Sequence, residues 1–263
     1  GQSNTAIGYK CLEGSSIYTG SDKNVAIGYQ CGQFIGTSVS HTPTKNVLIG
    51  YQCGMGAAGN DEDGVSKSFR GTENTFIGNQ CGFSNTTGTL NVAIGSECFK
   101  GNKSGFGNTS IGQFSLVSNS TGHNNVAIGA KALSYNLTGE NIGIGVGVLG
   151  NQTDAGGSHT IEHDGQTFTV NGNNIAIGTV SGYNLNSAFN ILIGNSCFTG
   201  ESLIENSNNN VAIGQFCGFY AKSGAENNVL IGYECAKGAS GSQHNFNGKN
   251  NTYCLLYTSP SPR

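Results

Sequence analysis

Nine cysteines have the widest chemical range of any residues in this chain of 263 residues. A thiol can form a disulfide, bind a metal ion or act as a nucleophile. Eight of them stand three residues after a glycine that closes an Asn-x-x-Ile-Gly motif: Cys11, Cys31, Cys53, Cys81, Cys98, Cys197, Cys217 and Cys235. Only Cys254 follows no such glycine. A shared place in a repeat indicates a shared structural role.

The cysteines allow two alternatives to a packing role. Stacked copies would bring their Cα atoms to about 4.8 Å, within the range that a disulfide tolerates. They fall in runs of five and three, however, so pairing would leave one thiol over in each run. A metal ladder on an oligomer axis is the second alternative. Because other motifs hold Ser115, Ala132, Val148 or Ser181 at this place, we interpret the cysteines as small buried residues.

Two loops carry residues that could hold a metal ion. His159 and His163 share one face of a predicted strand, with Glu162 and Asp164 nearby. The acidic stretch 60–64 lacks the full spacing of a calcium loop. We interpret the first as an exposed polar hairpin with an Asp-Gly turn, and the second as a solvated loop. We therefore assign no metal site and expect no cofactor.

Nothing in the sequence is a candidate for catalysis. No cysteine has a histidine close to it in its own repeat, and no serine stands in a nucleophile-elbow pattern. A net charge of −3 gives no basic footprint for nucleic acid. No run of about eighteen apolar residues is present to span a membrane. We expect a protein that is not an enzyme.

The motif itself recurs twelve times without a break. Its asparagine is always followed by Thr, Val or Ile, and then by Ile and Gly at plus three and plus four. The twelve Asn, Ile and Gly triplets are Asn4, Ile7, Gly8; Asn24, Ile27, Gly28; Asn46, Ile49, Gly50; Asn74, Ile77, Gly78; Asn91, Ile94, Gly95; Asn108, Ile111, Gly112; Asn125, Ile128, Gly129; Asn141, Ile144, Gly145; Asn174, Ile177, Gly178; Asn190, Ile193, Gly194; Asn210, Ile213, Gly214; and Asn228, Ile231, Gly232. So strict a repeat predicts a stack of equivalent rungs.

Each motif predicts one β-strand that is apolar on both faces. The β-branched residue and Ile share one face, which we expect to fill the interior of a narrow coil. The residue between them lies on the opposite face, and it is mostly Ala or Leu. We expect this second face to need a partner surface, which predicts self-association. The glycine permits a tight corner, and a second short strand such as 29–31 is expected after it. The asparagines are expected to hydrogen-bond from rung to rung.

These motifs resemble the head repeats of trimeric autotransporter adhesins. Those repeats read Asn-Ser-Val-Ala-Ile-Gly, which is matched without the serine by Asn-Val-Ala-Ile-Gly at residues 24–28 and 125–129. Similar Asn-Thr-Ala-Ile-Gly-Tyr repeats, as in residues 4–9, occur in tail fibres of phages and other viruses. The resemblance covers Asn4 to about Thr252. It implies an all-β fold, a left-handed parallel β-roll of about twelve rungs, assembled as a homotrimer. Cysteine stands where the family more often has alanine. A column of free thiols favours assembly in a reducing compartment, and so a viral fibre over an exported adhesin.

Two other solenoid classes are less consistent with the sequence. A hexapeptide acyltransferase needs three consecutive hexapeptides per turn, and only one, 27–32, is found in a turn. An ice-binding solenoid needs flat rows of threonine, but the β-branched column has threonine only at Thr5, Thr75 and Thr109. Both remain lesser alternatives.

The repeat also delimits the domains. We expect residues 1–253 to form the β-roll, with a hairpin insertion at about 151–172 and a thirteenth rung opening at Asn251. Residues 254–263 carry no trace of the repeat and look like one reading frame of a transposase sequencing adaptor, so we expect them to be foreign. Because the chain opens at Gly1 and Asn4 already belongs to a motif, we expect a fragment truncated at both ends.

The function expected from these patterns is attachment. The chain would be an adhesin head-like segment, or alternatively the shaft of a viral or phage tail fibre, on the surface of a cell or virion. Its partners would be copies of itself and a receptor, glycan or protein. We expect receptor contacts in the loops that vary between rungs: 37–45, 57–73, 151–172 and 201–209.

Overall fold

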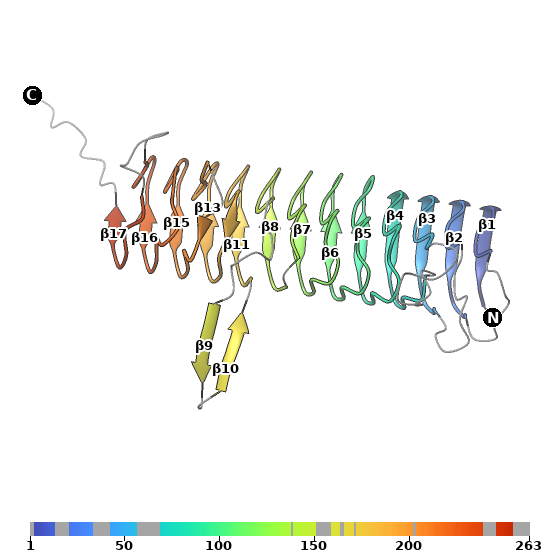
Figure 1. The fold of residues 1–263 in the computed structure, drawn as a ribbon. Helices are drawn as coiled ribbons and strands as arrows, with labels where there is room; N and C mark the ends of the chain where they lie inside the picture. Colours follow the sequence, from blue (N-terminus) through green and yellow to red (C-terminus); the bar gives the residue numbers. More distant parts are fainter. Residues whose placement is uncertain are drawn as a thin grey trace, which may run out of the picture. The chain divides into compact units, whose positions relative to one another are not determined.

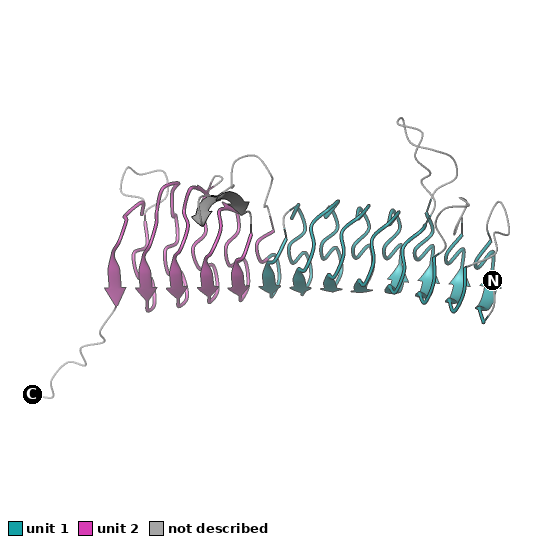
Figure 2. Ribbon diagram, turned by 90° about the horizontal axis from the view of Figure 1, so that it is seen from below, with its two compact units in different colours: residues 1–147 teal, residues 148–263 magenta. Residues whose placement is uncertain are grey.

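The computed structural model describes residues 3–13, 21–33, 43–56, 69–137, 139–150, 159–163, 166–170, 172–201, 204–238 and 246–254 (Figure 1). The chain forms two compact units, Gly1–Gly147 and Val148–Arg263, coloured teal and magenta in Figure 2. The described residues form β-strands and turns, and none of them lies in a helix. In particular, they contain no helix long and apolar enough to cross a membrane.

Unit 1 is a stack of parallel strands, one for each motif. Their bounds are β1 Thr5–Tyr9, β2 Val25–Tyr29, β3 Val47–Tyr51, β4 Thr75–Asn79, β5 Val92–Ile94, β6 Thr109–Ile111, β7 Val126–Ile128 and β8 Ile142–Ile144. Each strand pairs with the next in the same register, so that Ile94 lies beside Ile111 and Ile111 beside Ile128. The predicted all-β parallel solenoid is confirmed for this unit.

Unit 2 repeats the arrangement. Its stacked strands are β11 Ile175–Ile177, β13 Ile191–Ile193, β15 Val211–Ile213, β16 Val229–Ile231 and β17 Thr252–Cys254. They pair in parallel and in register, while β12 Leu185–Asn186 and β14 Ile204–Glu205 form a second, short parallel pair. The strand that follows Asn251, where we predicted the opening of a further rung, pairs with β16. It also includes Cys254, so the pairing continues one residue past the boundary predicted at 253.

The predicted hairpin is confirmed. Strands β9 His159–His163 and β10 Gln166–Val170 pair antiparallel, with His163 opposite Gln166 and His159 opposite Val170. The Asp-Gly turn that joins them lies outside the described residues. Two residues between antiparallel strands are the length that a tight hairpin turn requires.

The faces of the repeat strands are the reverse of our prediction. The middle residue of each motif points inward, and Ala93, Ala127 and Leu192 are fully buried. The isoleucines point outward, with 36% to 37% of Ile128, Ile144 and Ile193 exposed. The interior is too narrow for a β-branched residue and an Ile in every rung. The small middle residues of most motifs, such as Ala93 and Ala127, are therefore the sequence feature that indicates the buried face.

Two columns of side chains fill this narrow interior, and in several rungs their sizes complement each other. One is the middle residue of the motif, and the other stands four residues after the motif glycine. In the rungs of Ala93 and Ala127 the first is small and the second is large: Phe99 and Leu133 are both fully buried. Where the first is Leu48, the second is Gly54, and a Cβ there would lie 2.8 Å from the Leu48 side chain. In these rungs the two columns together fill the interior.

The second strand predicted after each glycine is wrong. The segment that includes the cysteine forms a turn, with left-handed residues on either side of it: φ is 53° at Glu97 and 56° at Phe99, around Cys98. A third left-handed residue precedes each asparagine, such as Leu90 at 59° before Asn91. These turns still bond along the stack, since Gly82 N–H donates to Cys98 O at 3.0 Å. Rung-to-rung hydrogen bonds are what offset the strain of left-handed residues.

Candidate functional site

The motif asparagines form a continuous hydrogen-bonded ladder inside each unit. Asn108 is typical: its Oδ1 accepts from the backbone N–H and from Nδ2 of Asn125, both at 3.0 Å. Its Nδ2 donates to Asn91 Oδ1 at 3.0 Å and to Gly122 O at 3.0 Å. Only 1% of Asn108 is exposed. The predicted rung-to-rung role of the asparagines is confirmed, and this asparagine ladder uses both amide hydrogens.

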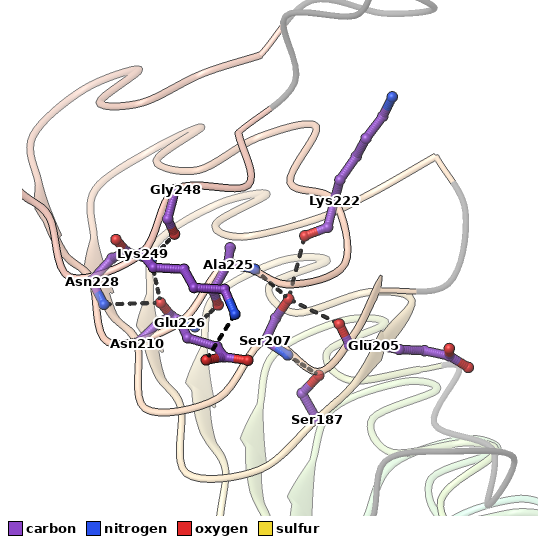
Figure 3. A network of polar contacts seen from close by, with 10 residues as sticks. All are labelled: Ser187, Glu205, Ser207, Asn210, Lys222, Ala225, Glu226, Asn228, Gly248 and Lys249. Carbon is purple, nitrogen blue, oxygen red and sulfur yellow. Dashed lines mark hydrogen bonds and ion pairs between the residues drawn. The ribbon is translucent and has the colours of Figure 1, made fainter.

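The ladder also fixes the residue three positions before most of its asparagines. Its carbonyl accepts the side-chain amide from the rung before, as Figure 3 shows for Asn210 to Ala225 O at 2.8 Å and Asn228 to Gly248 O at 2.7 Å. A Cβ at the equivalent Gly71 would lie 2.6 Å from Asn74 Nδ2. Small residues stand here because the ladder occupies the space a larger side chain needs.

A serine network surrounds the same place in unit 2 (Figure 3). The fully buried Ser207 hydroxyl donates to Lys222 O at 3.3 Å and accepts from Ala225 N–H at 3.1 Å. Ser207 N–H in turn donates to Ser187 Oγ at 3.0 Å. The hydroxyl is bonded to backbone groups, so it ties the loops of successive rungs together and has the geometry of a structural residue.

A second asparagine column was missed from the sequence. It comprises Asn85, Asn102, Asn119 and Asn136, each seven residues after a motif glycine and fully buried. Asn102 Nδ2 donates to Asn85 Oδ1 at 2.6 Å, and Asn102 Oδ1 accepts from Gly105 N–H at 3.0 Å. The signal was available, because these asparagines recur at the same 17-residue spacing as the motifs around them.

The cysteine column lies at the inner side of the glycine corner. All seven members from Cys31 onward are buried and Cys11 is half-buried, with free thiols. The thiols donate to carbonyls of the next rung, as Cys81 Sγ does to Ala93 O at 3.1 Å and Cys217 Sγ to Leu230 O at 3.2 Å. Ser115 makes the equivalent bond to Ala127 O at 3.2 Å. The place therefore suits a small residue, and preferably one with a hydrogen to donate.

The environment of most of these thiols suppresses the reactive thiolate. Burial raises the pKa of the Cys31 and Cys235 thiols above the ordinary value, and raises that of Cys81 well above it. The hydrogen bond with the Cys81 thiol, together with burial, raises the pKa of Cys98, whereas the hydrogen bond with the Cys197 thiol lowers the pKa of Cys217. Because only the thiolate is a nucleophile or a metal ligand, the thiols with a raised pKa have the chemistry of packing groups.

Thiol labelling tests this assignment. At pH 8 the exposed Cys254 is expected to react at once with a disulfide reagent, while the seven buried thiols react at least about 100-fold more slowly, through local opening. In guanidinium chloride all nine should react together. Rapid native labelling of Cys81 or Cys98 would show that the column is open to solvent.

The outer face is the second feature of the site. We use this name for the β-branched and Ile side chains of the stacked strands. In unit 1 the exposed fraction is 37% at Ile94, Ile111 and Ile128, and in unit 2 it is 36% at Ile213 and 41% at Ile231. The β-branched residues beside them are half-buried or exposed. In each unit the outer face is thus a continuous apolar strip across the strands.

Tyrosines extend the outer face of unit 1 over its first three strands. The rings of Tyr9, Tyr29 and Tyr51 stack with centroids 5.1 Å apart, and between 40% and 57% of each residue is exposed. Beside them, Gln52 Nε2 donates to Gln30 Oε1 at 2.9 Å. Aromatic and amide ladders of this kind stabilise parallel strands stacked in register.

The loops in which we expected receptor contacts are only partly described. Of these ranges, the structure describes 43–45, 69–73, 159–163, 166–170, 172, 201 and 204–209. The side chains of His159, Glu162 and His163 lie outside the described residues, as does the acidic stretch 60–64. Across the described part of the chain, no three His, Cys, Asp or Glu side chains gather to hold a metal ion.

Comparison with known proteins did not identify a family. No family model matches the chain, and no curated protein or solved structure matches it either.

Proposed function

We propose that this chain is a segment of a non-enzymatic fibre, in which three copies associate through their outer faces and present loops for attachment to a host cell or surface. The proposal follows the resemblance to adhesin head repeats. The fibre would stand on the surface of a cell or a virion. The receptor, glycan or protein, would be contacted by the loops that differ between rungs, because these can vary without disturbing the stack.

The outer face is the observation that carries the proposal. Single soluble chains rarely leave a contiguous apolar surface larger than a few hundred Å² open to water. Here every described repeat strand except β17, which has Cys254 in place of Ile, adds an Ile and a β-branched residue to such a strip. Closed, symmetric association of identical copies is the usual way to cover a repeated surface of this kind.

The shaft of a viral or phage tail fibre is the second candidate. The free cysteine column favours it, since stacked thiols are a hazard in compartments where disulfides form. Both candidates share the trimeric solenoid, and they differ in the compartment in which the chain folds.

A charge placed on the outer face tests the association. Ile128→Glu would bury three carboxylates in a trimer, and we expect the association constant to fall at least about 100-fold, which leaves monomers at micromolar concentration. Ser104→Glu adds the same charge to an exposed loop residue and should leave the assembly unchanged.

Size-exclusion chromatography with light scattering measures both variants beside the wild type. The melting temperature of each variant shows that it still folds. A wild-type chain that elutes as a monomer, or an Ile128→Glu variant as large as the wild type, would contradict the proposed role of the outer face.

A further inference from the structure

The sequence contains seven Asn-x-Ser/Thr triplets, the acceptor pattern for N-linked glycan. They begin at Asn85, Asn102, Asn108, Asn119, Asn136, Asn151 and Asn250. Acceptor asparagines in secreted proteins stand on surface loops, because the glycan is bulky and must reach solvent. The structure instead buries five of these seven asparagines inside the fold.

Five of the acceptors lie in the interior of unit 1. Asn108 belongs to the asparagine ladder, and the other four form the second asparagine column. The exposed fraction is 1% for Asn108 and 0% for Asn85, Asn102, Asn119 and Asn136. Asn250, by contrast, is exposed, and it has a left-handed backbone conformation just ahead of β17. Only its backbone N–H bonds to the preceding rung, donating to Glu226 O at 2.9 Å. Asn151 lies outside the described residues.

Glycosylation of a buried acceptor removes a hydrogen that the fold uses. Transfer forms a bond from Nδ2 to the anomeric carbon of the sugar and breaks the bond from that carbon to the pyrophosphate of the lipid-linked donor. Nδ2 loses one proton. Asn108 Nδ2 needs both of its hydrogens, for Asn91 Oδ1 and Gly122 O. Asn102 Nδ2 likewise bonds to Asn85 Oδ1 at 2.6 Å and to Gly105 O at 3.3 Å.

Steric exclusion adds to the lost hydrogen bond. The sugar would have to occupy the space between consecutive rungs, where backbone hydrogen bonds such as Thr109 N–H to Asn125 O at 2.8 Å close the stack. Interiors packed at this density have no room for even one added methylene without strain. A glycan and a closed rung are mutually exclusive at these positions.

We propose that these five asparagines accept an N-linked glycan only while the chain is unfolded, and that a glycan on any one of them keeps its rung out of the stack. The solenoid must then form away from an oligosaccharyltransferase. Free stacked thiols favour a reducing compartment, and so they independently disfavour the same secretory route. This inference concerns where the chain folds and does not depend on the proposed adhesive role.

Cell-free translation of the full chain behind a secretory leader tests the proposal. Thr153→Ala removes the Asn151 acceptor in every arm, and a reducing agent keeps the thiols free throughout. The arms are translation without microsomes, with microsomes, and with microsomes plus an inhibitor of lipid-linked donor synthesis. Glycosidase-sensitive mass shifts give the number of glycans, and limited proteolysis gives the folded fraction.

A matched variant keeps Asn250 as its only acceptor. It carries Thr87→Ala, Ser104→Ala, Ser110→Ala, Thr121→Ala and Thr138→Ala, and Ser110→Ala introduces the commonest residue at that place in the motifs. With microsomes, the chain that keeps the five acceptors should carry several glycans and be digested at least about tenfold faster than without them. The variant should carry one glycan and stay resistant.

The inhibitor arm separates the glycan from the substitutions. Blocking donor synthesis should restore resistance to the chain that keeps the five acceptors. A protease-resistant product with a glycan on any of the five asparagines would overturn the proposal. So would a resistant product from microsomes with none of the five occupied, or a sensitive one when donor synthesis is blocked.

Discussion

Replacing Gly112 with alanine is expected to lower the free energy of unfolding by more than about 4 kcal/mol, at the far end of what single substitutions do. The φ of Gly112 is +133°, which L side chains rarely adopt. An added Cβ would lie 2.5 Å from the carbonyl oxygen of Gly129 in the next rung and 2.6 Å from its carbonyl carbon. Since both atoms belong to the backbone, no side-chain movement can relieve the overlap.

Gly224→Ala is the matched control. Its φ of +90° is also unfavourable for alanine, but nothing lies within 4 Å of the added Cβ. Backbone strain alone should then cost about 1–3 kcal/mol. Guanidinium unfolding followed by circular dichroism, at one protein concentration, gives both values. Equal losses of stability at Gly112 and Gly224 would show that contact with the backbone of the next rung is not the reason for the motif glycine.

Replacing Asn108 with alanine is the second large effect. The substitution removes the Asn108 acceptor from Asn125 Nδ2 and from the Asn125 N–H inside the stack, while Gly122 O keeps the bond from Asn119 Nδ2 at 3.0 Å. Each of the two donors that loses its acceptor costs about 1–3 kcal/mol, so we expect a total loss of about 2–6 kcal/mol. Asn108→Asp keeps the shape and the acceptor, but it lacks both donors and adds a buried charge. We expect it to destabilise at least as much as alanine does.

An exposed asparagine in the same sheet provides the comparison. Asn79 ends β4 with its side chain in solvent, and Asn79→Ala should change stability by no more than about 0.5 kcal/mol. The same unfolding measurement applies to all three variants. If Asn108→Asp were as stable as the wild type, the ladder would not depend on the amide hydrogens.

The periodic features of the fold could be predicted because each depends on residues at fixed spacing. One strand per motif, the asparagine ladder and the antiparallel hairpin all follow from short-range patterns. These patterns do not indicate which face of a strand points inward, because both faces of a strand such as Val126–Ile128 are apolar. Only the size of the middle residue, Ala127, distinguished inside from outside.

The turns after the glycine could not be predicted from residue type. Left-handed positions are ordinarily held by Gly or Asn, yet here they include Glu97, Phe99 and Leu133. These side chains adopt the conformation because the neighbouring rungs bond to their backbone: Glu97 N–H donates to Asn79 O at 2.8 Å, and Phe99 N–H to Ser115 O at 2.9 Å. The local conformation is therefore determined by the stack as a whole, and the sequence of a single motif does not predict it.

Sedimentation equilibrium of residues 1–253 tests most directly the claim that the outer face is an interface between copies. Removal of residues 254–263 eliminates the exposed Cys254 and with it any covalent dimer. The proposed fibre predicts three times the mass of one chain across a wide range of concentration. A single monomeric species that stays folded and soluble at high concentration would contradict it.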